Sequence, residues 1–164
     1  MDLTKYSLED LLLAAIKSEQ ESNLIYTRIA ETVENGLMID KFKFLANEET
    51  KHRKYIEQLY QKQFPKKPLQ LPKETPVPLP EITIPADEQI SLSDVIQQAM
   101  HAEQAAHDFY LGLSERFEDT SIKHMLHYFA DMEQGHYRIL EQEQQSLKWF
   151  EESDVYWPMV HAGP

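Results

Sequence analysis

Two short stretches of the sequence have the residue types and the spacing that bind transition metals. Glu49 and His52 form a Glu-x-x-His pair. Glu133 and His136 form a second such pair 84 residues later. On a helix, residues three apart share one face, so the carboxylate and the imidazole of each pair can hold one metal ion. A single pair arises easily by chance on a charged helix, whereas its recurrence indicates a duplicated metal site.

The duplication extends well beyond these two pairs. Each half contains a glutamate, a tyrosine seven residues after it, and the Glu-x-x-His pair thirty residues after the same glutamate. The glutamate and the tyrosine are Glu19 and Tyr26 in the first half, and Glu103 and Tyr110 in the second. The chain therefore carries one half-site twice.

The composition narrows the function classes. The chain has 164 residues, a net charge of −12 and no cysteine. Such an acidic protein is a poor partner for nucleic acid or an anionic membrane surface. Without cysteine it has no disulfides, thiolate zinc sites or iron–sulfur clusters. A chain of this length is expected to form one domain over residues 1–164. A signal-peptide pattern and an apolar run of ~18 residues are both absent, so we expect a cytoplasmic location.

Four helices are needed to position the six polar residues. The apolar periodicity predicts helices at about 7–35, 38–61, 91–118 and 120–147, each with the stripe of a bundle helix. Ser7 is expected to cap the first helix and Asp119 the fourth. Asn35 and Gly36 are expected to end the first helix, with Gly36 in the left-handed conformation.

The segment between the two helix pairs, residues 63–90, contains seven of the nine prolines. It predicts extended chain that, at about 3.1 Å per residue, can run the full length of a bundle. We therefore predict an all-α fold of two antiparallel helix pairs joined by a long proline-rich crossover. A domain-swapped dimer would assemble the same residues, and this alternative stays open. The aromatic tail, 149–164, is interpreted as packing on the bundle or on a second subunit.

The polar residues of both half-sites occupy positions that face the core in the helical periodicity. They are Glu19, Glu49, His52, Glu103, Glu133 and His136. An ionised carboxylate costs several kcal/mol to bury without compensation, and four approach the ~5–15 kcal/mol stability of a whole domain. Two divalent cations would balance four carboxylates and two neutral imidazoles. Oxygen and nitrogen ligands suit iron or manganese and tolerate zinc, and di-iron carboxylate bundles use this combination of glutamates and Glu-x-x-His pairs.

Over roughly residues 7–147 the sequence resembles a ferritin-like di-iron protein of the rubrerythrin and bacterioferritin type. The similarity to rubrerythrin is closest in residues 18–26 and 46–52. The resemblance implies a ferritin-like four-helix bundle in which Glu49 and Glu133 bridge two irons. The terminal ligands that it implies are Glu19, His52, Glu103 and His136. It also implies that Tyr26 and Tyr110 hydrogen-bond a ligand carboxylate across the bundle.

The sequence departs from these families in three ways. Rubrerythrins carry a further glutamate where this chain has Ala106, so the rubrerythrin-type movement of iron is not expected. Rubrerythrins often carry a cysteine-ligated rubredoxin module, which this chain cannot build, so electrons must come from an external donor or from iron itself. Bacterioferritins bind haem through a methionine where Thr50 and Gln134 stand here, so no haem is expected.

These observations predict a non-haem di-iron oxidoreductase of the peroxidase or ferroxidase type, most simply a homodimer. It would reduce hydrogen peroxide or dioxygen with oxidation of ferrous iron. The alternatives are a ferritin-like iron-storage protein with a ferroxidase centre, a di-iron hydroxylase and a metal-free helical interaction module. His107, which matches Asn23 in the repeat, is interpreted as a surface histidine, with a place beside the metal ligands as the alternative. The unmatched histidines, expected to be exposed, are His101, His124, His127 and His161.

Overall fold

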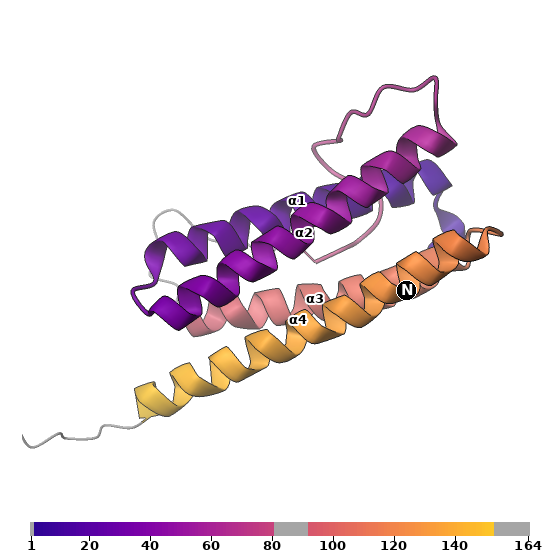
Figure 1. Ribbon diagram of the computed structural model, residues 1–164. Coiled ribbons are helices and arrows are strands. Elements are labelled where there is room, and N and C mark those ends of the chain that lie inside the picture. The colour runs from indigo at the N-terminus through magenta and orange to yellow at the C-terminus, as the bar shows by residue number, and fades with distance from the viewer. Residues whose placement is uncertain (1, 81–91, 153–164) are drawn as a thin grey trace, which may run out of the picture.

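The protein is an all-helical four-helix bundle, as the sequence predicts (Figure 1). The computed structural model describes residues 2–80 and 92–152. The helices are α1 (Leu8–Thr32), α2 (Gly36–Gln63), α3 (Leu92–Ser114) and α4 (Thr120–Glu152), preceded by the short 3-10 helix η1 (Leu3–Lys5). In Figure 1, α1 and α2 form one antiparallel pair and α3 and α4 the other, with α2 and α3 running in the same direction. No helix in these ranges is long and apolar enough to cross a membrane.

Two apolar clusters fill the interior and leave a polar layer between them. One cluster contains the N-terminal part of α1 and the C-terminal part of α2, with Leu12, Ile56 and Leu113 fully buried. The other contains the opposite ends of α1 and α2 together with the N-terminal part of α3, including Phe42 of α2 and Ile96 of α3. On every helix the predicted metal-binding residues fall in the gap between the two clusters. The burial of apolar side chains on both sides stabilises the fold by roughly 25 cal/mol per Å² of apolar surface. It thereby fixes the position of the polar layer along the bundle.

Side-chain caps set where the helices begin. Ser7 and Asp10 form a reciprocal capping box at the start of α1, as the sequence predicts. The carboxylate of Asp119 accepts hydrogen bonds from the backbone N–H groups of Ser121 (2.8 Å) and Ile122 (3.3 Å) at the start of α4. Each cap satisfies donors that the first helical turn leaves unpaired.

The prediction for Asn35 and Gly36 is wrong. Gly36 is the first residue of α2 and does not adopt the left-handed conformation. The side chain of Asn35 instead accepts a hydrogen bond from the backbone N–H of Met38 at 3.2 Å and caps α2. Asparagine is among the best N-cap residues. Asn35 and Gly36, which were predicted to end the first helix, therefore begin the second.

The C-terminal and proline-rich segments are only partly described. Helix α4 extends to Glu152, so the predicted tail begins inside it, and Trp149 is 63% exposed on that helix. The rest of the tail, 153–164, lies outside the described residues. Residues 64–80 form no helix or strand and pack on the bundle, burying Val77 and pairing Lys67 with Glu9. Residues 81–91 also lie outside, so the complete crossover stays a prediction.

Candidate metal centre

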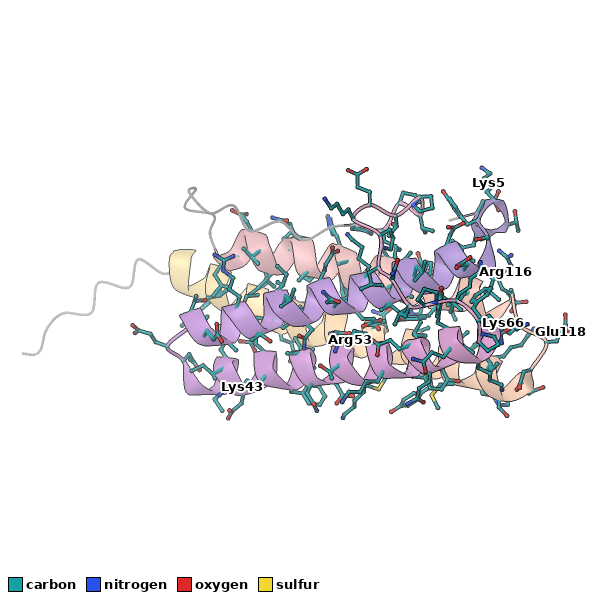
Figure 2. All side chains as sticks on the ribbon, turned by 90° about the horizontal axis from the view of Figure 1, so that it is seen from above. Lys5, Lys43, Arg53, Lys66, Arg116 and Glu118 are labelled. Atoms are coloured by element: carbon teal, nitrogen blue, oxygen red, sulfur yellow. The ribbon has the colours of Figure 1, made fainter. Side chains whose placement is uncertain are left out.

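All six polar residues predicted from the sequence meet in one buried layer within a single chain. Helix α1 supplies Glu19, α2 supplies Glu49 and His52, α3 supplies Glu103, and α4 supplies Glu133 and His136; their exposed fractions are 1–4%. Ordinary charged residues behave differently, since Lys43 and Glu118 point outward from the bundle (Figure 2). The bundle therefore buries a selected set of ionisable groups that lies between its two apolar clusters.

These residues form two overlapping groups of donor atoms. In each group the four donor atoms lie within 4.8 Å of one another; the groups are Glu19, Glu49, His52, Glu133 and Glu49, Glu103, Glu133, His136. Glu49 and Glu133 belong to both groups. A carboxylate has two oxygens and can serve two ions at once, so the geometry allows two adjacent ions bridged by these two glutamates.

Each histidine turns the same ring nitrogen toward the carboxylates. His52 Nδ1 lies 2.9 Å from a carboxylate oxygen of Glu133 and 3.4 Å from one of Glu49. His136 Nδ1 lies 3.1 Å from both of the same carboxylates. The two imidazole rings are stacked with centroids 5.8 Å apart. Nδ1 is therefore the nitrogen that each histidine presents to an ion.

Burial and mutual charge divide the four carboxyls of the layer into two kinds. Burial, with the charges of Glu49 and Glu133, raises the pKa of Glu19 and of Glu103 well above the usual value. Burial also acts to raise the pKa of Glu49 and Glu133, but the nearby imidazoles of His136 and His52 outweigh it and lower the pKa of both. The two central glutamates therefore favour the ionised form more than a free carboxyl does, and the two outer ones favour the protonated form.

The histidines are shifted against the effect of their burial. Burial acts to lower the pKa of His52 and His136, but the three carboxylates close to each imidazole raise it. Metal ions that bind in this layer would compete with the protons of these groups. Two divalent ions would balance four carboxylates beside two neutral imidazoles.

Several buried polar atoms of the layer lack a hydrogen-bond partner, so protons alone do not satisfy its hydrogen-bonding groups. Glu49 Oε1, Glu133 Oε1 and His52 Nδ1 are buried, and none of them makes a hydrogen bond of acceptable geometry. Buried polar atoms in native proteins are nearly always paired. A metal ion at each group would occupy all three atoms, so the donor set fits a two-metal centre.

Two tyrosines link the half-sites across the bundle. The hydroxyl of Tyr26 on α1 donates to Glu103 on α3, and that of Tyr110 on α3 donates to Glu19 on α1. Burial, with the charge of the partner carboxylate next, raises the pKa of both phenols well above the usual value. Both hydroxyls therefore remain protonated donors that hold the outer glutamates in place.

A second pair of contacts was missed by the sequence analysis. Asn23 Nδ2 donates to the carbonyl oxygen of Ala46 at 2.6 Å, and His107 Nδ1 lies 2.8 Å from the carbonyl oxygen of Ala130. His107 is half-buried, so the surface interpretation is wrong, although its partner is backbone and not a metal ligand. The signal was its match with Asn23 at the repeat offset. The described unmatched histidines, His101, His124 and His127, are exposed as expected, and His161 lies outside the described residues.

Comparison with known proteins identifies a family and a similar solved structure. The family model described as Rubrerythrin matches residues 10–144. A solved structure, described as a hypothetical protein Pfu-1136390-001 from Pyrococcus furiosus, is 36% identical with a TM-score of 0.79; the match covers 90% of this chain and 95% of that one. No curated protein matches the chain.

Proposed function

The chain belongs to the rubrerythrin family of ferritin-like di-iron proteins, and from this premise we propose that it is a di-iron oxidoreductase. It would reduce hydrogen peroxide or dioxygen while oxidising ferrous iron. The observation that carries the proposal is the buried layer of two overlapping donor groups, each with three carboxylates and one imidazole. Manganese and zinc also accept this donor set, and family membership favours iron.

The bound irons would supply the electrons and the electrophilic centre for reduction of the oxidant. The residues of the chain bind and orient them. Glu49 and Glu133 would bind both ions, because they belong to both donor groups, and each histidine would supply one nitrogen. The hydroxyls of Tyr26 and Tyr110 fix the outer carboxylates, and such partners of a ligand typically alter metal affinity 10–100-fold.

The apolar clusters on both sides of the layer exclude bulk water. Electrostatic interactions within the layer are stronger for that reason. The raised pKa of the outer carboxyls and of the histidines favours their protonated forms, so the binding of ions would displace protons from them. The chain has no cysteine from which to build an iron–sulfur electron relay, so the proposal includes an external electron donor.

Stopped-flow oxidation of the anaerobically loaded diferrous protein tests this function. We expect peroxide, dioxygen or both to oxidise the centre, with the faster oxidant identifying the substrate. The double variant Glu49→Ala, Glu133→Ala should show no such reaction. Its matched control is Glu31→Ala, Glu115→Ala, which removes two exposed acids at the same repeat offset. A wild-type protein that holds two ferrous ions and reacts with neither oxidant would refute the proposal.

A further inference from the structure

One side of α4 carries a second stripe of mostly apolar residues, in addition to the one that faces the core. Its members are exposed or half-buried and recur at alternating steps of three and four residues: Met125, Tyr128, Met132, Gly135 and Ile139. Tyr128 is 56% exposed, and Phe44 of the neighbouring helix α2 is 48% exposed. A helix of a monomeric bundle needs an apolar stripe only toward its own core, so the second stripe indicates contact with another surface.

Two hollows follow the junction of α2 and α4 along this side. The first is an apolar pocket of about 350 Å³ that lies against His136 and is lined by Phe44 and Met132. The second, of about 480 Å³, is lined by Lys41 of α2 and by Trp149, farther along α4. The described end of the proline-rich segment lines a different hollow, against α1. It therefore does not cover this side of the bundle.

The charges beside the stripe fit a second copy of the chain that runs in the opposite direction. Asp131 and Arg138 are both exposed and lie two helical turns apart on α4, too far to pair with each other. Neither forms an ion pair with another described residue. When two α4 helices lie antiparallel with Met132 of one beside Gly135 of the other, Asp131 of each copy lies within one turn of Arg138 of the second copy. Opposite charges then meet twice, once on each side of the centre.

The apolar residues are complementary in the same arrangement. Tyr128 of one copy falls beside Ile139 of the other, and Met132 falls beside Gly135, so each larger side chain meets a smaller one. Gly135 lowers helix stability, and its own chain does not require it, because an added Cβ atom would meet nothing within 4 Å. The approach of Met132 from a second copy supplies a reason for the glycine. In a parallel arrangement glycine would face glycine and leave a gap.

The size of this side suits a dimer. The same spacing continues along α4 to Trp149, which is 63% exposed. At 1.5 Å per residue the stripe from Met125 to Trp149 is about 36 Å long, and with the adjoining side of α2 it is about 20 Å wide. These dimensions give roughly 700 Å² per chain, close to the ~800 Å² that each partner buries in a standard interface.

We propose that the stripe of α4, with the adjoining side of α2, is the interface of a symmetric homodimer in which the two α4 helices lie antiparallel. A symmetric dimer uses one patch twice, as the reciprocal contacts of Asp131 and Arg138 require. Each copy would cover the other's pocket between α2 and α4, and would exclude water from the side of the bundle on which His136 lies. The proposal does not rest on bound metal, so it can fail without affecting the proposed di-iron function.

Sedimentation of the full chain with reversed charges tests the pairing. The wild-type chain should be dimeric at about 100 μM, since interfaces of this size have Kd values from micromolar downward. Asp131→Arg and Arg138→Asp each bring like charges together across the interface and should each weaken self-association at least about tenfold. An equimolar mixture of these two single variants should dimerise again, because each arginine then faces an aspartate. The double variant Asp131→Arg, Arg138→Asp should dimerise as well.

The matched controls reverse an exposed pair of opposite charges on α1. Arg28→Asp and Glu31→Arg make the same changes away from the stripe and should leave the dimer unchanged. Circular dichroism of every variant checks that the helices are retained.

Gly135→Leu tests the apolar contact separately. It removes the space for Met132 of the second copy and should weaken self-association at least about tenfold. The thermal midpoint of unfolding of the monomer should stay the same or rise, because leucine favours helix more than glycine does and the space around Gly135 is open within the chain.

Three results would overturn the inference. One is a wild-type chain that is monomeric at the same concentration; if a chain that ends at Glu152 then dimerises, residues 153–164 are the occupant of this side. Another is a dimer that persists in both single charge variants, because a domain-swapped dimer or a different surface would then explain it. The third is a mixture of the two variants that associates no more than either variant alone.

Discussion

The two halves of the molecule agree on the side that faces the metal layer and differ on the side that faces away. Inside, each half contributes two glutamates and a histidine through Nδ1, and each tyrosine crosses to the other half's outer glutamate. Outside, the ring of His52 is covered by Phe129, whereas that of His136 meets Phe44 edge-on at 6.4 Å beside an apolar pocket. The geometry of the ligands is shared by the two halves, whereas the aromatic surroundings of the two histidines differ.

Removing one histidine at a time is the strongest test of whether the two halves are equivalent ligand sets. His52→Ala and His136→Ala should each weaken one iron by more than about 100-fold, since even the groups behind a ligand are worth 10–100-fold. Anaerobic iron titration of each variant measures this, with the exposed His124→Ala as control. If one variant kept both irons at wild-type affinity, the two halves would not be equivalent ligand sets.

The pH dependence of metal binding tests whether both halves hold protons. The pKa of Glu19 and of Glu103 is raised, and so is that of each histidine, so these four groups keep their protons to higher pH than free side chains do. Binding two ions should release protons, up to about four per chain, and lowering pH from about 8 to about 6 should therefore weaken binding. Calorimetry in two buffers with different ionisation heats counts the protons. A release near zero would contradict the raised pKa of these four groups.

A smaller effect is expected from the crossed tyrosines. Tyr26→Phe and Tyr110→Phe each remove one hydrogen bond to an outer glutamate and should weaken metal binding by about tenfold. The same titration measures both, and equal losses are expected because the two contacts are matched. A loss confined to Tyr110→Phe would show that the halves differ inside as well as outside.

The smallest effect is expected at the contacts between helices within each pair. Asn23→Ala and His107→Ala each remove one side-chain hydrogen bond to a backbone carbonyl of the paired helix and should lower the free energy of unfolding by about 1 kcal/mol. Urea denaturation of the metal-free protein measures the change. Stability equal to wild type in both variants would show that these contacts do not hold the helix pairs together.

The fold and the ligand set could be predicted from the sequence because both follow from the helical periodicity of its apolar residues. Glu19 falls on the apolar stripe of its helix and recurs as Glu103, so both its burial and its partners follow from the sequence. Asn35 could not be assigned in the same way, because an asparagine between two helices can end one or cap the next. The structure resolves this through its bond to Met38.

The pocket over His136 lay beyond any reading of the sequence. It is lined by residues of α2 and α4, and how closely these two helices approach one another does not follow from helical spacing.

The central claim is that the buried polar layer is the binding site of two metal ions. Native mass spectrometry of the anaerobically loaded chain measures the number of ions directly. We predict two irons per wild-type chain and none in the Glu49→Ala, Glu133→Ala variant, because these glutamates belong to both donor groups. A wild-type chain without metal, or a double variant that still carries two irons, would contradict the account.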